Sequence, residues 1–499
     1  MNYSGMFLSC LPEVIIVATA LIVLLDDLVL LRTCPRTTRG WAAVLVLTFG
    51  CTLAIWRAGV SNSEYANFGG MLDLDGLGLL MKQVILTITI LVGWITIVSD
   101  FTEHVGEYFV MLLLGTVGMM LLVTTRNLLM VFLCLELLSL ALYIITGFSK
   151  SSVASSEAAL KYFLFGGMSA ALLLFGLSLI YGITNNVDLT GIGSALSGKP
   201  LEPIALIGIL MIVAGFGFKV AAVPFHLWAP DAYQGAPGPA AAFIASGSKV
   251  ASFFILAKFV FIAFAQNTGS AAWHQFATGW MPILAVIAVL SMVLGNLAAI
   301  AQSSVRRLLA YSAIAQAGYM ILGLLAGNAD GLIALLYYVI TYALTVLGAF
   351  AIVILVQENA GHEQFAAFAG LAKRAPVLSF CMMLFLLSLA GIPPLAGFFG
   401  KFYLFTSAMK GAKDLGLLSI VLVALGASAV SLYYYLIVLR QIYVAAPAGT
   451  LQGKLQPSPV VQGVIILLAA AVLLLGCFPG ILVSRIQAAS KQSNSAWFK

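Results

Sequence analysis

The chain has 499 residues, of which 62% are hydrophobic and 8% are charged, and its formal net charge is +6. A soluble domain carries roughly 25% charged residues, so this composition excludes an ordinary soluble enzyme and indicates a protein embedded in a membrane. The net charge is small for this length and gives no reason to expect a nucleic-acid partner.

No cofactor site is visible in the sequence. The six cysteines, at positions 10, 34, 51, 134, 381 and 477, do not approach Cys-x-x-Cys spacing, which argues against a zinc site or an iron-sulfur cluster. The sequence also contains no Walker loop, no Gly-x-Gly-x-x-Gly after a strand and no haem-attachment motif. We therefore expect neither a redox centre nor a nucleotide site in this chain.

Apolar runs predict the fold class. Fourteen of them, with centres from Ala20 to Ala470, are near the ~20 residues that cross a bilayer. The expected fold is an all-α polytopic membrane protein with about fourteen transmembrane helices. The first run carries Glu13 and lacks a basic flank, so it is predicted to remain as a helix and not to be a cleaved signal peptide. Loops on one side hold ten lysines and arginines and the opposite loops hold five, which places both termini on the periplasmic side.

Paired motifs predict an internal repeat. An Arg-x-Leu-Leu sequence occurs at Arg126 and again at Arg306, and the related sequences GFGFK and GFFGK end at Lys219 and Lys401. The two pairs are separated by nearly the same length of chain. Because five helices is an odd number, two copies of five helices would insert with opposite topology, as in many transporters. The predicted divisions are an N-terminal three-helix appendage (1–104), a first inverted repeat (105–265), a second inverted repeat (280–445), and a C-terminal helix with a short tail (458–499).

Two of the predicted helices are broken. The stretch GFGFKVAAVPFHLWAPDAYQGAPGP places Lys219 in an apolar run and then loses helical character at its prolines. A break at membrane depth is tolerated only where the freed backbone faces protein or water, so Lys219 is expected to line a hydrated interior. The alternative is that Lys219 extends to a nearby interface. His226 lies seven residues further on, on about the same face if the helix continues past Pro224. The second break, GIPPLAGFFGK, leads to Lys401.

Two more ionisable residues lie within predicted spans. Glu136 is near the middle of its helix, where a charge facing lipid would cost at least ~2.5 kcal/mol, so it is expected to face inward and to pair with Lys219. Lys249 lies in a stretch of small residues that permits close packing and a hydrated seam. Lys258 is on the opposite helical face, with the alternative that it extends to the interface. Glu157 and Lys161 are predicted to form an ion pair at a helix entrance.

These groups favour proton transfer. One acid and three lysines in a low dielectric cannot all stay charged, so at least one lysine is expected to release its proton. No set of oxygen ligands for a metal cation is present, and H⁺ is therefore the expected cargo. When Arg126 is aligned with Arg306, Glu136 maps to Gln316, a candidate polar link that would leave the second half without a carboxylate.

The runs FKVAAVPFHLWAPDAYQGAPGPAAAFIASGSK, RRLLAYSAIAQAGYMILGL and LAGIPPLAGFFGKFYLF resemble the antiporter-like subunits of respiratory complex I, the proton-pumping NADH:quinone oxidoreductase. The similarity is strongest to its N type, the counterpart of mitochondrial subunit 2. The M type has glutamate in place of Lys401, and the L type continues into a long lateral helix. The resemblance implies a proton channel from Glu136 and Lys219 through Lys249 and His226 to Lys401.

The resemblance also implies partners. FMN, iron-sulfur clusters and quinone would belong to other subunits, and this chain would contact an M-like subunit and small membrane subunits in the bilayer of the cell inner membrane. Two alternatives stay open. A subunit of a cation/proton antiporter complex or of a membrane-bound hydrogenase would show the same relay, and a non-conducting scaffold would show the fold without the chemistry.

Overall fold

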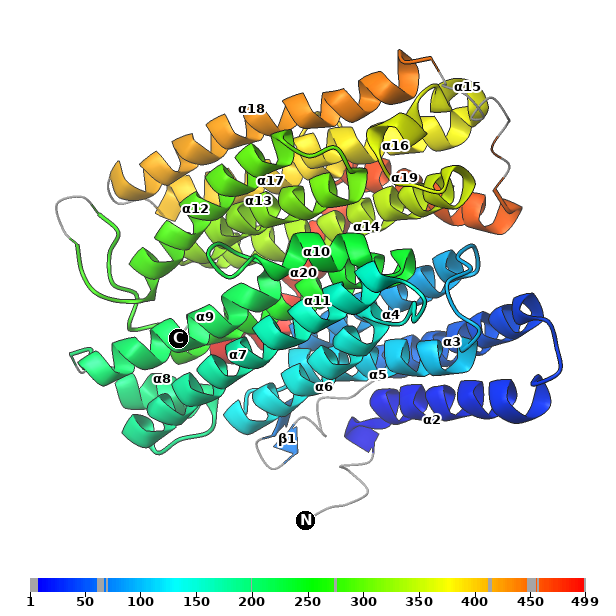
Figure 1. Ribbon diagram of the computed structural model, residues 1–499. Helices are drawn as coiled ribbons and strands as arrows, with labels where there is room; N and C mark the ends of the chain where they lie inside the picture. Colours follow the sequence, from blue (N-terminus) through cyan, green and yellow to red (C-terminus); the bar gives the residue numbers. More distant parts are fainter. Residues whose placement is uncertain are drawn as a thin grey trace.

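The computed structural model describes residues 8–60, 67–68, 71–198, 200–272, 276–411, 415–446, 455 and 457–497. Nearly all of these residues are helical, apart from loops and a small antiparallel pair of strands, β1 (Asn67–Phe68) and β2 (Leu72–Asp73). The long helices lie side by side, with α2 at one edge of the molecule and α18 at the other (Figure 1).

The helices fall into three stretches of the chain. The first comprises α2 (Leu11–Leu25), η1 (Asp26–Leu30), α3 (Arg36–Gly59) and α4 (Gly76–Thr96). The second comprises α5 (Val105–Val123), α6 (Leu128–Thr146), α7 (Val153–Thr184), α8 (Leu189–Leu196), α9 (Pro203–Val220), α10 (Trp228–Gly235), α11 (Gly238–Lys258) and η3 (Phe259–Ala263). The third comprises α12 (Trp280–Ile300), α13 (Val305–Leu325), α14 (Ala329–Ala360), η4 (Phe365–Phe368), α15 (Leu371–Arg374), α16 (Pro376–Ala390), α17 (Ala396–Gly411), α18 (Leu415–Tyr443), α19 (Pro459–Cys477) and α20 (Gly480–Trp497).

Twelve helices of the described chain are long and apolar enough to cross a membrane, which confirms the polytopic all-α class. The number fourteen stays a prediction, since α2 and α16 have 15 described residues each and fall short of that length. Three of the loop cations behind the predicted orientation, Lys199, Lys413 and Lys454, lie outside the described residues.

Helices α6 and α13 each begin after a polar residue whose side chain caps the helix. The Asn127 side chain accepts hydrogen bonds from the second and third backbone N–H groups of α6, at 3.0 and 3.3 Å. The Ser304 hydroxyl accepts from the Arg307 N–H of α13 at 3.3 Å. Such side chains satisfy N–H groups that have no partner within the helix, so these two residues fix where α6 and α13 begin.

The two predicted breaks are present and share one backbone motif. Ala221 follows the last residue of α9 and Gly391 follows the last residue of α16, and both have left-handed backbone conformations, with φ of 58° and 88°. In each, the following N–H bonds back to the carbonyl five residues earlier, from Ala222 to Gly217 at 2.8 Å and from Ile392 to Leu387 at 3.0 Å. This motif satisfies helix-end carbonyls before a proline-containing turn.

The two lysines of the related sequences lie on different sides of these breaks. Lys219 belongs to the last turn of α9, before the first break, whereas Lys401 belongs to α17, after the second. The similar sequences GFGFK and GFFGK therefore do not occupy equivalent positions, and the distance between them along the chain does not describe a structural correspondence.

The centre of the molecule is formed by α11, α13 and α14. Every residue of α11 from Pro239 to Lys258 is buried, and nearly all of α13 is buried as well. By contrast, α7 and α18 leave many large apolar side chains exposed, as expected for helices that face lipid or another subunit.

The C-terminal tail is helical. The sequence predicts a short tail after the last membrane helix, and in the structure residues 480–497 form helix α20, which packs against α4 and α14. The Trp497 indole N–H donates to the Asp75 carboxylate at 2.9 Å, and the Ser493 hydroxyl accepts from the Leu77 N–H at 3.2 Å. The polar residues of this segment, which obscure the helix in the sequence, bond to the beginning of α4.

Candidate functional site

Lys219 lies in the protein interior at the end of α9 and is 8% exposed. Its ammonium group donates a hydrogen bond to the Ser139 hydroxyl of α6. It also faces the aromatic rings of Phe218 and Tyr143, at 5.4 and 5.6 Å from the ring centres. Lys219 is therefore held by a neutral oxygen and two aromatic faces, and it does not extend to an interface.

Glu136 lies close enough to Lys219 for its charge to act on that ammonium group, as expected for a pair that is coupled by charge. Within the described part of the chain, Lys219 has no ion pair with a carboxylate at 4 Å or less. Glu136 is half-buried, and its helical neighbours Leu133 and Leu140 are 51% and 50% exposed. Lys219 and Glu136 are thus linked by electrostatics, while Ser139 makes the contact.

Lys249 is 1% exposed in the middle of α11. Its ammonium group donates to the Ala313 carbonyl of α13 at 2.6 Å and lies 5.4 Å from the centre of the Tyr342 ring. A carbonyl inside a helix normally accepts a hydrogen bond from an N–H group of the same helix. The bond from Lys249 is therefore a second hydrogen bond to the Ala313 carbonyl. Lys249 thereby joins the two halves of the molecule.

Lys401 is 3% exposed, and its hydrogen-bond partners among the described residues are neutral oxygens. It donates to the Leu389 and Ala390 carbonyls, at 3.0 and 3.1 Å, and to the Ser428 hydroxyl at 2.9 Å. The two carbonyls are those that the second break leaves free at the end of α16. The broken helix therefore supplies the acceptors for the lysine that follows it, which is the role that membrane proteins give to such breaks.

Gln316 lies at the Lys401 site. Its amide donates to the Leu389 carbonyl at 3.1 Å, the same carbonyl that Lys401 uses, and its oxygen accepts from the Tyr338 hydroxyl. Counted from the capping residues that start the two helices, Gln316 is as far along α13 from Ser304 as Ser139 is along α6 from Asn127. By this count Gln316 corresponds to Ser139 and not to Glu136.

His226 lies in the turn between α9 and α10. The ring is half-buried, burial lowers the pKa of its imidazole, and its Nδ1 has no hydrogen-bond partner among the described residues. No hydrogen bond within the described chain joins His226 to Lys219, Lys249 or Lys401.

Sequence reasoning misses several polar groups of the interior. The spacing of the tyrosines is typical of ordinary apolar packing, yet Tyr338 and Tyr435 bond to Gln316, and the Tyr434 hydroxyl donates to Asn296 at 2.9 Å. The run of three tyrosines from Tyr433 to Tyr435 is the available signal. These hydroxyls can carry a proton between partners that have no direct contact.

Two further buried lysines are held differently. Lys82 of α4 pairs with Glu13 of α2 at 2.5 Å, with side chains 0% and 5% exposed. Lys258 is fully buried and donates to the Val123 and Thr125 carbonyls at the end of α5, at 2.9 and 3.2 Å, so it does not extend to the interface. The predicted Glu157–Lys161 pair is confirmed at 2.7 Å.

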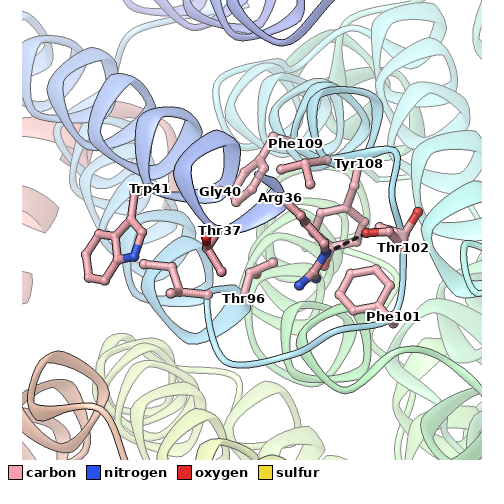
Figure 2. Close-up of a pocket in the computed structure, with 11 residues that line it drawn as sticks. Arg36, Thr37, Gly40, Trp41, Thr96, Phe101, Thr102, Tyr108 and Phe109 are labelled. Atoms are coloured by element: carbon pink, nitrogen blue, oxygen red, sulfur yellow. Dashed lines mark hydrogen bonds between the residues drawn. The ribbon is translucent and has the colours of Figure 1, made fainter. Parts of the chain in front are cut away.

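An enclosed pocket lies away from these groups, between the ends of α3, α4 and α5 (Figure 2). Arg36 lines it and donates to the Thr102 carbonyl at 2.7 Å while pairing with Asp100 at 2.8 Å. None of the six candidate residues lines this pocket. Within the described residues no group of three or more histidine, cysteine or acidic side chains can hold a metal ion. The candidate site is thus a set of buried lysines on α9, α11 and α17.

The fold and the site together define a class. A bundle of membrane helices with two broken members and buried lysines on neutral acceptors is the architecture of ion-translocating membrane subunits. The model of the family described as "NADH:quinone oxidoreductase/Mrp antiporter, TM" matches residues 125–426. The chain belongs to this family.

Similar proteins agree with that assignment. The chain is 50% identical to "NADH-quinone oxidoreductase subunit N 2" of Acidobacterium capsulatum, over 97% of this chain and 98% of the relative. It is similar to a chain of respiratory complex I from Thermus thermophilus, with a TM-score of 0.77 and 31% identity, over 95% of this chain and 98% of that one. A chain of the Mrp complex from Dietzia sp. has a TM-score of 0.79 at 20% identity, over 97% and 98%, and shares the fold alone.

Proposed function

We propose that this chain is a proton-translocating membrane subunit of an NADH:quinone oxidoreductase, in which quinone reduction elsewhere in the complex drives H⁺ transfer through it. The 50% identity to a subunit of that complex supports the assignment. The observation that carries it is that Lys249 and Lys401, both buried, donate to neutral oxygens, and that no carboxylate among the described residues pairs with either. Tyrosine rings also face the two ammonium groups, at 5.4 and 4.7 Å, but no opposite charge in the described part of the chain holds the proton there, so each lysine can pass it on.

The proposed relay assigns one role to each group. Glu136 sets the charge on Lys219, Lys219 exchanges its proton by way of Ser139, Lys249 bridges the halves, and Lys401 is the terminal carrier. Gln316 and the tyrosine hydroxyls around it are polar links, and His226 is a neutral donor or acceptor beside the first break. The residues of the relay are Glu136, Lys219, His226, Lys249, Gln316 and Lys401.

The surroundings are part of the proposal. FMN, iron-sulfur clusters and quinone belong to other subunits, and the partners are an M-like antiporter subunit and small membrane subunits in the inner membrane. The loop charges support termini on the periplasmic side. The ion pair between the first turn of α2 and the second turn of α4, with the bond from Trp497 to Asp75, supports a common side for both termini. We propose that the chain divides into an N-terminal appendage (1–104), two inverted repeats (105–265 and 280–445) and a C-terminal helix with a short tail (458–499).

The test is Lys401→Ala in the assembled complex, reconstituted in liposomes and supplied with NADH. Acidification of the liposome interior should fall relative to the rate of quinone reduction, while the amount of assembled complex is unchanged. Lys410→Ala is the matched control, since Lys410 is on the same helix but 69% of its side chain is exposed. Equal acidification by both variants would refute the relay and favour a scaffold.

The second candidate is a subunit of a cation/proton antiporter complex. The likeness to the Mrp chain supports it only through the fold. Both functions predict loss of transport in Lys401→Ala, but only the antiporter requires Na⁺ or K⁺ on the opposite side. Acidification that is unchanged when choline replaces both cations is the expected result for the oxidoreductase.

A further inference from the structure

The segment that follows the first break, residues 221–238, is packed between the two halves of the molecule. Toward the first half, Trp228 stacks on Tyr162 of α7, with ring centres 4.2 Å apart and an interplanar angle of 3°. Toward the second half, Tyr233 meets Phe350 of α14 edge to face at 5.9 Å. In Figure 1 this segment, marked by α10, lies near the middle of the molecule.

Backbone groups of this segment are satisfied by the second half. The Val223 N–H donates to the Ser291 hydroxyl of α12 at 2.9 Å. Arg306 of α13 donates to the Gln234 and Ala236 carbonyls, at 2.8 and 3.2 Å. Since a broken helix must find partners for its free backbone groups, the position of this segment depends on α12 and α13.

One carboxylate connects the segment to both halves at once. Asp231 of α10 accepts from Lys161 of α7 and from Arg307 of α13, each at 2.8 Å. Burial raises the pKa of Asp231, but the hydrogen bonds and charges of Lys161 and Arg307 outweigh it and hold the pKa below its ordinary value. Asp231 is therefore charged at neutral pH. We call Asp231, Lys161 and Arg307 the Asp231 clasp.

Helix α13, which contributes Arg307 to the clasp, also contributes contacts at Lys249 and Lys401. Beyond Arg307, α13 presents the Ala313 carbonyl to Lys249 at 2.6 Å. One turn further, Gln316 shares the Leu389 carbonyl with Lys401, at 3.1 and 3.0 Å. A displacement of α13 relative to α10 would thus change the contacts of Lys249 and Lys401 together.

We infer that Asp231 is a positioning residue. Through Arg307, it fixes α13 against residues 221–238, the segment that follows Lys219. In this way it keeps Lys219, Lys249 and Lys401 aligned for proton transfer. This rests on the proposed function. Lys161 supplies the opposite anchor, so that the first half, the broken helix and the second half meet at one carboxylate. Packed side chains and ion-pair networks can carry coupling between distant groups, and the clasp is a contact of that kind.

The experiment separates the effect of the charge of Asp231 from the effect of its size, in the assembled and reconstituted complex. Asp231→Asn keeps the size of the side chain and removes its charge, whereas Asp231→Glu keeps the charge. We expect Asp231→Asn to lower acidification relative to quinone reduction, and Asp231→Glu to restore most of it. Arg307→Gln should also lower acidification, and the loss in the double variant Asp231→Asn/Arg307→Gln should be smaller than the sum of the two single losses, because both single variants remove the bond between Asp231 and Arg307.

The matched control is Asp330→Asn. Asp330 pairs with Lys410 at 3.0 Å and joins α14 to α17, two helices of the same half. Normal transport in both Asp231→Asn and Asp330→Asn would overturn the inference, as would loss of the assembled complex in both Asp231→Asn and Arg307→Gln, which would make the clasp a folding contact. Normal transport in Asp231→Asn with transport lost in Lys401→Ala refutes the clasp alone. Normal transport in Lys401→Ala refutes the relay itself.

Discussion

Two kinds of buried lysine occur in this molecule, and they differ in the oxygen that they hold. Lys82 contacts the Glu13 carboxylate, whereas Lys401 contacts two carbonyls and a hydroxyl. A carboxylate in a poorly solvated site stabilises the ammonium form strongly, and neutral acceptors stabilise it less. Lys82 is thus suited to hold its proton and Lys401 to release it.

The charge at Glu136 should matter more than the amide at Gln316. Glu136→Gln removes the acidic group whose field acts on Lys219, whereas Gln316→Ala removes neutral hydrogen bonds worth about 1 kcal/mol each. We expect Glu136→Gln to reduce NADH-driven acidification several-fold more than Gln316→Ala does. Equal losses in liposomes of matched protein content would contradict this ranking.

His226 should give the complex a pH-dependent stability. Because burial lowers the pKa of His226 below 6.5, the unfolded chain binds more protons than the folded one as pH falls through that value. Stability should therefore rise as pH increases toward 6.5, and His226→Gln should flatten part of this rise. Melting temperatures of the solubilised complex at three pH values measure it, and an unchanged slope in the variant would contradict it.

At the level of single helices, the breaks are defined by their backbone motif more than by their lysines. Ala221 and Gly391 end their helices in the same left-handed conformation, although Lys219 precedes its break and Lys401 follows its own. The two halves of the molecule thus use the same backbone turn to end a helix. The lysine lies before this turn in the first half and after it in the second.

Gly391→Ala tests this motif. Its φ of 88° disfavours any side chain, and a Cβ atom would lie 3.1 Å from Lys401 Cδ. The left-handed conformation costs an alanine roughly 1–2 kcal/mol, and Lys401 must also shift. We expect a lower melting temperature together with reduced acidification per quinone reduced.

The control for Gly391→Ala is Gly426→Ala, at a helical position with nothing within 4 Å of the added Cβ. It should be neutral or stabilising by about 0.5–1 kcal/mol, since alanine favours a helix over glycine. Similar effects from both variants would mean that the left-handed turn is not what holds Lys401.

At the scale of the whole molecule, local sequence patterns predict the fold class and the two helix breaks. They do not predict contacts between residues that lie far apart in the sequence. Composition and the prolines near Lys219 and Lys401 are local signals. The bond between Trp497 and Asp75 joins residues 422 positions apart, and no local pattern shows it. The repeated motifs are visible in the sequence, but aligning Arg126 with Arg306 pairs Gln316 with Glu136, because Arg126 lies before the capping residue of α6 whereas Arg306 lies inside α13.

The pair between Glu13 and Lys82 is the clearest contact of this kind. In the sequence Glu13 is only a charge in the first apolar run, and nothing marks Lys82 as its partner, yet they meet in the interior at 2.5 Å. The pair lies outside residues 125–426, the part of the chain that the family model matches. It connects α2 to α4, and α4 packs on the central helix α11.

This pair should act as a structural lock and not as part of the relay. Removing one partner leaves a buried charge without compensation, which costs about 3–5 kcal/mol, so Glu13→Leu and Lys82→Met alone should each reduce the yield and melting temperature of the complex. The double variant Glu13→Leu/Lys82→Met removes both charges and should recover the stability, or exceed it by up to about 1–4 kcal/mol. It should also acidify liposomes normally, because a lysine held by a carboxylate is not the one that gives up its proton. An assembled double variant that reduces quinone but has lost acidification would place Glu13 and Lys82 on a proton path and overturn the distinction drawn between Lys82 and Lys401.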